Sequence, residues 1–211
     1  MAEVDWGLAT VLGVAVLFLV WYYAAFVYTR RLAGRIATEL KDAMLALGGT
    51  SRIQWFGTSA FRIATEEANP PFRQISLTVT LRPREMPINW AIGTVQGRRD
   101  AALVEGSLRK VPKVAFELVD PATRLGKRRS RARSDWSPVS MGGRQMLLAS
   151  DDDGRVLRIL DALDVGTLAS VMALHVTAGS EPGIAASVSV QRGEAARGLV
   201  AIRTLGELLT G

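Results

Sequence analysis

The chain opens with a long apolar stretch that no charged residue interrupts. Between Gly7 and Tyr28 there is no Asp, Glu, Lys or Arg. A helix needs about 20 apolar residues to cross a hydrocarbon layer of roughly 30 Å, so residues 7–28 are long enough to do so. Aromatic residues, which favour membrane interfaces, stand at both ends of the stretch: Trp6, Trp21, Tyr22, Tyr23 and Tyr28. We therefore predict a transmembrane anchor over residues 1–29.

A cleaved signal peptide is the main alternative for this stretch. It would require a basic start, a shorter apolar run and a cleavage site flanked by small residues. Here Glu3 and Asp5 make the start acidic, the run is long, and its tyrosine-rich end offers no such site. These features favour an uncleaved anchor.

Flanking charge predicts the orientation of the anchor. All 26 Lys and Arg residues follow Thr29, and three of them come directly after the apolar run: Arg30, Arg31 and Arg35. Cytoplasmic flanks carry the excess of Lys and Arg. We expect a single-pass protein of the cell membrane, with its N-terminus outside and the following domain in the cytoplasm.

A helical pattern continues behind the anchor, over residues 30–49. Apolar residues recur there at intervals of three and four, as on one face of a helix: Leu32, Ile36, Leu40, Ala43, Met44 and Leu47. Gly48 and Gly49 provide a C-terminal stop. Since nothing interrupts the pattern, we predict one helix from about Trp6 to Leu47.

Residues 50–211 show mostly the alternation of apolar and polar positions that is typical of strands. The predicted strands cover 52–56, 61–65, 73–81, 101–108, 114–119, 145–149, 168–176 and 184–190. Their links are too short for parallel crossovers, which favours antiparallel pairing. Helical patterns follow Gly154 and cover 194–209. The fold class is therefore α+β: a single N-terminal transmembrane helix, then a mainly antiparallel sheet domain with flanking helices.

A basic segment lies in the middle of this domain. It contains six cationic residues and no acid between them: Arg124, Lys127, Arg128, Arg129, Arg131 and Arg133. Burial of unpaired charge is costly, so we expect a solvated loop at 120–136. One interpretation is a connector that divides the domain into two halves. The others are binding to anionic lipid headgroups, or to nucleic acid or the ribosome.

A second segment combines apolar residues with a basic surround. Met86, Ile88, Trp90 and Ile92 lie between arginines, and Pro83 and Pro87 argue against a central strand. The segment suits an interfacial anchor or a contact with a partner protein. The alternative is a loop folded over the sheet that buries Trp90 and Ile92 in the core.

Composition excludes several chemistries. The absence of cysteine rules out disulfides, zinc–thiolate sites and a cysteine nucleophile. His175 is the single histidine and lies in a strand-like setting, which favours a packed side chain over a metal ligand. The acids at 151–153 suit the cap of a helix better than a calcium loop, whose twelfth position would be Ala162 rather than glutamate. No phosphate-binding motif is present, and we expect no cofactor.

These patterns leave three functional hypotheses. The first is a non-catalytic, membrane-anchored accessory or scaffold subunit, whose partners are membrane lipid and other membrane-protein subunits. The second is a membrane-tethered docking module that binds polyanions (anionic lipid, RNA or the ribosome) through the basic segment. The third is an enzyme whose site is assembled only in three dimensions.

Overall fold

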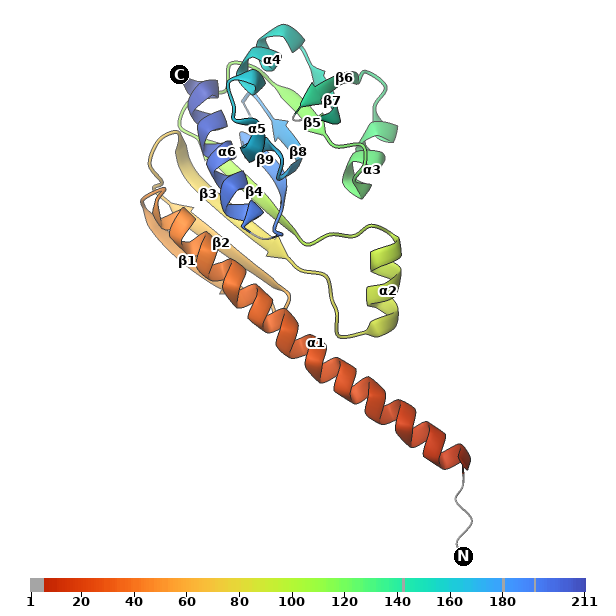
Figure 1. The fold of residues 1–211 in the computed structure, drawn as a ribbon. Coiled ribbons are helices and arrows are strands. Elements are labelled where there is room, and N and C mark those ends of the chain that lie inside the picture. Colours follow the sequence, from red (N-terminus) through yellow and green to blue (C-terminus); the bar gives the residue numbers. More distant parts are fainter. Residues whose placement is uncertain (1–5, 142, 180, 192) are drawn as a thin grey trace, which may run out of the picture.

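One long helix connects the N-terminal segment to the domain. The computed structural model describes residues 6–141, 143–179, 181–191 and 193–211, so Glu3 and Asp5 lie outside the described residues. Helix α1 (Trp6–Leu45) is unbroken over 40 residues, which confirms the predicted continuous helix. At 1.5 Å per residue it is about 60 Å long. Figure 1 shows its N-terminal half projecting away from the rest of the molecule.

The two halves of α1 have different surroundings. Every side chain from Trp6 to Ala24 is exposed, and this half is long and apolar enough to cross a membrane, a test of length and composition that signal sequences also pass. The second half contacts α6 and β2. The residues that it buries recur at helical spacing, as predicted: Ala33, Ile36, Ala37, Leu40 and Met44.

Among the described residues, nine strands form one sheet. In chain order they are β1 (Thr50–Trp55), β2 (Ala60–Glu66), β3 (Phe72–Thr80), β4 (Ala101–Leu108), β5 (Phe116–Val119), β6 (Ser137–Met141), β7 (Arg144–Ser150), β8 (Val171–Val176) and β9 (Ile184–Ser189). Neighbouring strands follow the order β1-β2-β3-β4-β9-β8-β5-β7-β6. Every pair is antiparallel, which confirms both the expected pairing and the α+β class.

The order of the strands departs from chain order at two places: β7 lies between β5 and the edge strand β6, and a later hairpin stands between β4 and β5. β4 and β5 follow each other in the chain, yet the hairpin formed by β8 and β9 lies between them. β9 pairs with β4, and β8 pairs with β5. The last hairpin of the chain therefore joins the earlier strands into one continuous sheet.

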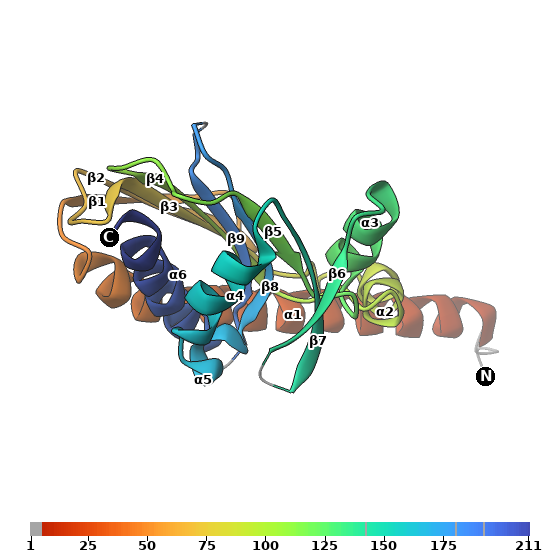
Figure 2. The ribbon, with the colours of Figure 1, turned by 90° about the horizontal axis from the view of Figure 1, so that it is seen from above.

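The remaining helices are shorter than α1. They are α2 (Pro87–Val95), α3 (Arg124–Ala132), α4 (Asp153–Asp161), α5 (Val165–Leu168) and α6 (Glu194–Thr210). α6 packs on α1, β4 and β9, and α4 packs on α6 and β7. Figure 2 shows α4, α5 and α6 grouped beside the sheet, with α2 and α3 apart from them. The hydrophobic core lies between the sheet and the layer of α1, α4 and α6.

Two segments expected to be loops are helices. The prediction of a loop at 120–136 is wrong, because residues Arg124–Ala132 form helix α3. Its Thr123 side chain accepts a hydrogen bond from the backbone N–H of Gly126 at 3.0 Å, which caps the helix. The apolar segment after Met86 forms α2, and Pro87 stands in its first turn, where the missing N–H is tolerated. Most helices can be recognised in a sequence by a stripe of apolar residues at helical spacing. α3 has no such stripe, so the sequence pattern did not indicate a helix there.

Candidate interfacial site

The apolar half of α1 meets the rest of the domain at its aromatic end. The indole Nε1 of Trp21 donates a hydrogen bond to the carbonyl oxygen of Arg84 at 3.0 Å. The rings of Trp21 and Trp90 meet with their centroids 5.7 Å apart and their planes tilted by 56°, a geometry that aromatic pairs favour. These contacts attach α2 and the segment before it to α1.

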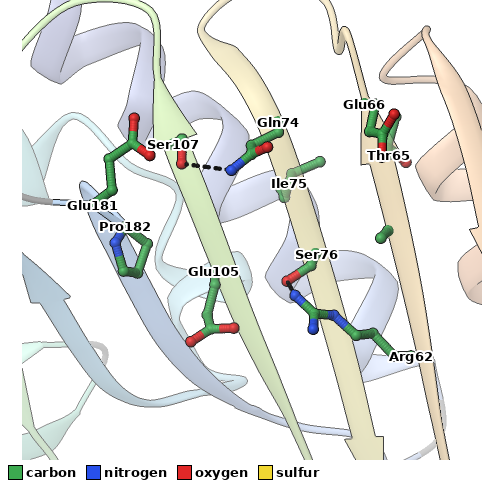
Figure 3. A pocket seen from close by; sticks show the side chains of 11 residues that line it. Arg62, Thr65, Glu66, Gln74, Ile75, Ser76, Glu105, Ser107, Glu181 and Pro182 are labelled. Carbon is green, nitrogen blue, oxygen red and sulfur yellow. Dashed lines mark hydrogen bonds between the residues drawn. The ribbon is translucent and has the colours of Figure 1, made fainter.

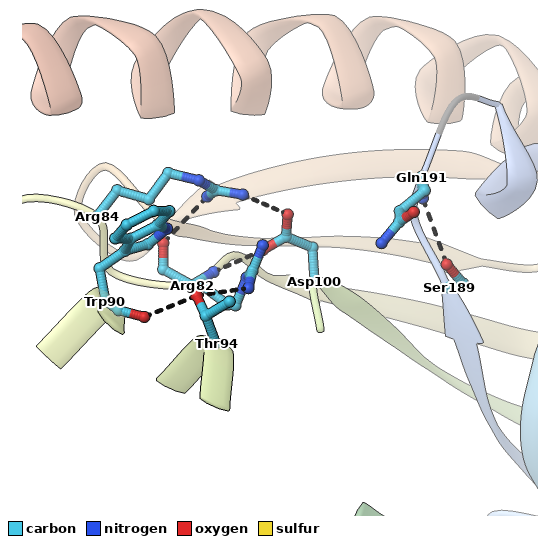
Figure 4. A network of polar contacts seen from close by, with 7 residues as sticks. All are labelled: Arg82, Arg84, Trp90, Thr94, Asp100, Ser189 and Gln191. Carbon is cyan, nitrogen blue, oxygen red and sulfur yellow. Dashed lines mark hydrogen bonds and ion pairs between the residues drawn. The ribbon is translucent and has the colours of Figure 1, made fainter. Parts of the chain in front are cut away.

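A buried carboxylate holds this segment in place (Figure 4). Asp100 is 7% exposed. It accepts a hydrogen bond from the backbone N–H of Arg82 at 2.7 Å and one from Nη2 of Arg84 at 2.6 Å. The Arg84 guanidinium also lies 5.5 Å from the centre of the Tyr28 ring in a cation–π contact. Asp100 therefore couples the sheet to the aromatic end of the apolar stretch.

Helix α2 exposes most of its apolar side chains. Met86 is 61% exposed, Ile88 65%, Ile92 49% and Val95 90%. The expectation that Trp90 and Ile92 fill the core beneath a loop is therefore wrong: Ile92 points to solvent, and the half-buried Trp90 packs on Trp21 of α1. In Figure 1 α1 runs diagonally and α2 stands nearly upright, so the two helices cross obliquely.

The basic helix α3 lies beside α2. Nη1 of Arg124 donates to Oε1 of Gln96, just after the end of α2, at 3.2 Å. A Cβ on Gly126 would stand 1.9 Å from the backbone oxygen of Asp120, so α3 approaches the chain before it as closely as only glycine permits. Four of the six predicted cationic residues line one open surface of α3: Arg124, Lys127, Arg128 and Arg131.

The other two cationic residues of this group form ion pairs within the domain. Nη1 of Arg129 contacts Oε1 of Glu117 on β5 at 2.8 Å. Arg133 binds Asp135 with two hydrogen bonds, of 2.5 and 2.7 Å. The hydrogen bonds from Arg133 lower the pKa of the Asp135 carboxyl, and the same pair raises the pKa of Arg133. Arg129 and Arg133 are thus less available for an external anion than their neighbours.

The other residues predicted to flank a membrane lie at the two ends of the apolar half. Tyr22 stacks on Phe26 with ring centroids 6.4 Å apart. The remaining members of this set are exposed: Trp6, Tyr23, Arg30, Arg31 and Arg35. The aromatic residues from Trp21 to Tyr28 extend over about 10 Å of the helix axis, which is comparable with the depth of a headgroup layer.

A second candidate surface is the face of the sheet that turns away from the core. We call it the open sheet face and define it by Arg62, Gln74, Ser76, Leu103 and Glu105, whose side chains alternate with core residues along β2, β3 and β4. Arg62 donates to the Ser76 hydroxyl at 2.9 Å. Figure 3 shows the polar side chains standing on these strands around a shallow hollow of about 380 Å³.

The other sequence candidates have structural roles. Asp152 caps α4 by accepting a hydrogen bond from the Arg155 N–H at 3.0 Å, as predicted for the acidic run. His175 lies on β8 opposite Glu117 of β5, and its buried Nδ1 has no hydrogen-bond partner in the part of the chain that the structure describes. Within that part, no cluster of three His, Asp or Glu side chains could hold a metal ion.

The central role of Asp100 could not be predicted from the sequence. It is a single acid after two arginines, and nothing in the local pattern sets it apart. Only the return of β4 beside β3 brings it to Arg82 and Arg84. In comparisons with known proteins, no family model matches the chain and no curated protein matches its sequence.

Proposed function

We propose that this protein is a non-catalytic accessory or scaffold subunit of a larger membrane protein complex. The observation that carries this proposal is the unbroken course of α1, from a fully exposed apolar half to a half that is buried in the domain. Sharp bends in helices require Pro, paired small residues or an inserted group, and α1 continues without one. The domain would thus be held at a fixed height and tilt above the lipid surface.

Charge supports a cytoplasmic position for the domain. The exposed arginines Arg30, Arg31 and Arg35 follow the apolar half of α1, and no cationic residue precedes it. Moving such a cluster across a bilayer during insertion is unfavourable. We place the N-terminus outside the cell membrane and the domain inside on this ground.

Helix α2 supports a second contact with the lipid surface. It meets α1 at the level of Trp21, so it would lie close to the surface of a membrane that α1 spans. Its exposed apolar residues, Met86, Ile88 and Ile92, could enter the layer between headgroups and acyl chains, as amphipathic interfacial helices do. α1 alone would fix the height and tilt of the domain. Membrane contacts from both α1 and α2 would also fix the rotation of the domain about the α1 axis.

We assign the contact with a partner protein to the open sheet face. It offers charges of both signs, Arg62 and Glu105, around Leu103, which is 43% exposed. Leu103 pairs across the sheet with Thr78 and Ser187, two small side chains that leave it accessible. Interfaces that form between separately folded proteins have this mixture of polar and apolar surface.

Site-specific photo-crosslinking in intact cells tests this proposal. A photoreactive amino acid at Leu103 should give a crosslinked species heavier than the protein. The matched control is the same residue at Val200, which is 54% exposed on α6. The proposal is wrong if Leu103 gives no more crosslinked product than Val200, and if the gently solubilised protein migrates as a monomer.

A second function, docking to anionic surfaces, is favoured by the position of α3. Its four cationic residues without a described ion pair, Arg124, Lys127, Arg128 and Arg131, lie on the helix that adjoins α2. If α2 lies on the membrane, α3 comes within reach of anionic headgroups, where each cationic residue contributes on the order of 1 kcal/mol.

Trypsin protection in lipid nanodiscs tests the docking function with the full chain. Cleavage after Lys127 and Arg128 should slow severalfold in nanodiscs rich in phosphatidylglycerol compared with pure phosphatidylcholine, and 0.5 M salt should remove the difference. Cleavage after the exposed Arg158 on α4 serves as the control. Equal cleavage of α3 in both lipids would count against lipid docking, and protection by added RNA would assign α3 to nucleic acid instead.

A further inference from the structure

A cavity lies between α1 and the segment that leads into α2. It has a volume of about 450 Å³, within the usual range for ligand sites. α1 contributes one wall, and the chain from β3 to α2 contributes the other. The lining residues are Trp21, Ala24, Ala25, Tyr28, Arg82, Arg84 and Trp90.

The wall formed by α1 is apolar. Ala24 and Ala25 are small, so they leave space between the larger rings of Trp21 and Tyr28 along the helix. Trp90 closes the opposite side through its contact with Trp21. Such a surface suits an aliphatic chain, because aromatic and methyl groups gain from burial of apolar area.

The other wall is cationic. Two guanidinium groups, those of Arg82 and Arg84, share the single carboxylate of Asp100. Arg84 donates hydrogen bonds to Asp100 and to the Arg82 carbonyl and lies over the Tyr28 ring. Arg82 is held less well: its buried Nε has no hydrogen-bond partner among the described atoms, and its Nη1 reaches Thr94 only at 3.4 Å.

A smaller hollow of about 250 Å³ adjoins this cavity and shares Arg82 and Trp90 with it. Its lining adds Arg98 and Asn89. With Arg82, Arg84 and Arg98 set against Asp100, the two hollows together have an excess of positive charge. They therefore favour an anion with several oxygen acceptors over a neutral or zwitterionic group.

We propose that the two hollows together bind one anionic membrane phospholipid. Its phosphate and anionic headgroup lie against Arg82, Arg98 and Asn89, and the upper part of an acyl chain follows Ala24 and Ala25 along α1. The inference rests on α1 crossing a membrane, as proposed above, and it does not depend on any partner protein.

The depth of the site fits this ligand. If residues 7–28 cross the membrane, interfaces included, the aromatic residues from Trp21 to Tyr28 form its cytoplasmic end, where acyl chains meet headgroups. Basic pockets beside membrane-spanning helices on the cytoplasmic side suit anionic headgroups in general. The cavity is apolar on the side of the span and cationic on the side of the domain, in the same order as the two parts of a phospholipid.

Native mass spectrometry of the full chain, released from nanodiscs containing equal amounts of phosphatidylglycerol and phosphatidylcholine, tests the proposal. The wild type should retain one phosphatidylglycerol in at least about tenfold preference to phosphatidylcholine. Ala25→Leu fills the apolar wall and should reduce retention of either lipid about tenfold. Arg82→Gln should retain lipid but lose most of the preference, because a charge-assisted contact is removed.

Two controls accompany these variants. Ala9→Leu makes the same change on an exposed part of α1 away from the cavity, and Arg52→Gln removes a charge from an exposed site on β1. Both should behave like the wild type. Equal retention of the two lipids by the wild type would overturn the proposal, and so would full retention by Ala25→Leu. The crosslinking result at Leu103 is independent of either outcome, so the two proposals fail separately.

Discussion

Replacement of Asp100 should be among the most destabilising changes in the domain. Asp100→Ala removes the acceptor for the Arg82 N–H and for the Arg84 guanidinium, whose side chain is 12% exposed. Loss of one partner from a buried charged pair costs about 3–5 kcal/mol, because the other charge is left without compensation. Asp100→Asn retains an acceptor for the Arg82 N–H and should cost less, about 2 kcal/mol.

Thermal unfolding in detergent, followed by circular dichroism, measures this effect. For a chain of this size 1 kcal/mol corresponds to about 2–4 °C, so Asp100→Ala should lower the midpoint by about 6–20 °C. Asp161→Ala, at an exposed acid on α4, is the control and should change little. Replacing the pair together, as Arg84→Met with Asp100→Leu, should cost less than Asp100→Ala alone. A midpoint for Asp100→Ala equal to that of Asp161→Ala would refute the reasoning.

Three further predictions concern other parts of the molecule. Leu40→Ala, at a fully buried position of α1, should destabilise the domain by about 2–5 kcal/mol in the same unfolding assay, and a loss below about 1 kcal/mol would mean that α1 is not part of the core. Gly126→Ala should shift α3 and cost about 1–3 kcal/mol, since its Cβ would overlap the Asp120 oxygen; faster trypsin cleavage within α3 reports the shift. Arg133→Gln should return the pKa of Asp135 to its ordinary value in a carbon-detected NMR titration. In the wild type the pair should persist above that ordinary pKa and be lost only as pH falls through the lowered one, and an unchanged titration would contradict this pairing.

The helices and strands that bury an apolar face were predictable from the sequence. In α1 the spacing of Ile36, Leu40 and Met44 identifies the face that meets the sheet, and the alternation from Ile75 to Val79 identifies β3. Such patterns are local, because burial on one side of an element imposes its own period on the chain. The boundary between the exposed and buried halves of α1 follows from the same reasoning.

Helices without a buried stripe could not be predicted in this way. α2 and α3 contribute almost nothing to the core: most apolar residues of α2 are exposed, and α3 is mainly cationic. Only Pro87 and Thr123, at their starts, indicate helices. β6 was also missed, since it is a short edge strand that contains Pro138. For the two helices the signal that is missing is a buried apolar face, whereas β6 packs Val139 and Met141 on the core but is too short to stand out.

The sequence by itself determined the long apolar helix, its amphipathic continuation, most strands and the α+β class, because each of these depends on residues close together in the chain. Only the tertiary structure decided the order of strands and the site at the aromatic end of the apolar stretch. The hairpin of β8 and β9 enters the sheet between β4 and β5, and Asp100 meets Arg84 because β4 returns beside β3. Trp21 and Trp90 are 69 positions apart in the chain, and they too are brought into contact only by the tertiary structure. Contacts between residues so distant in the chain leave no periodic trace in the sequence, since the packing of the whole sheet brings them together.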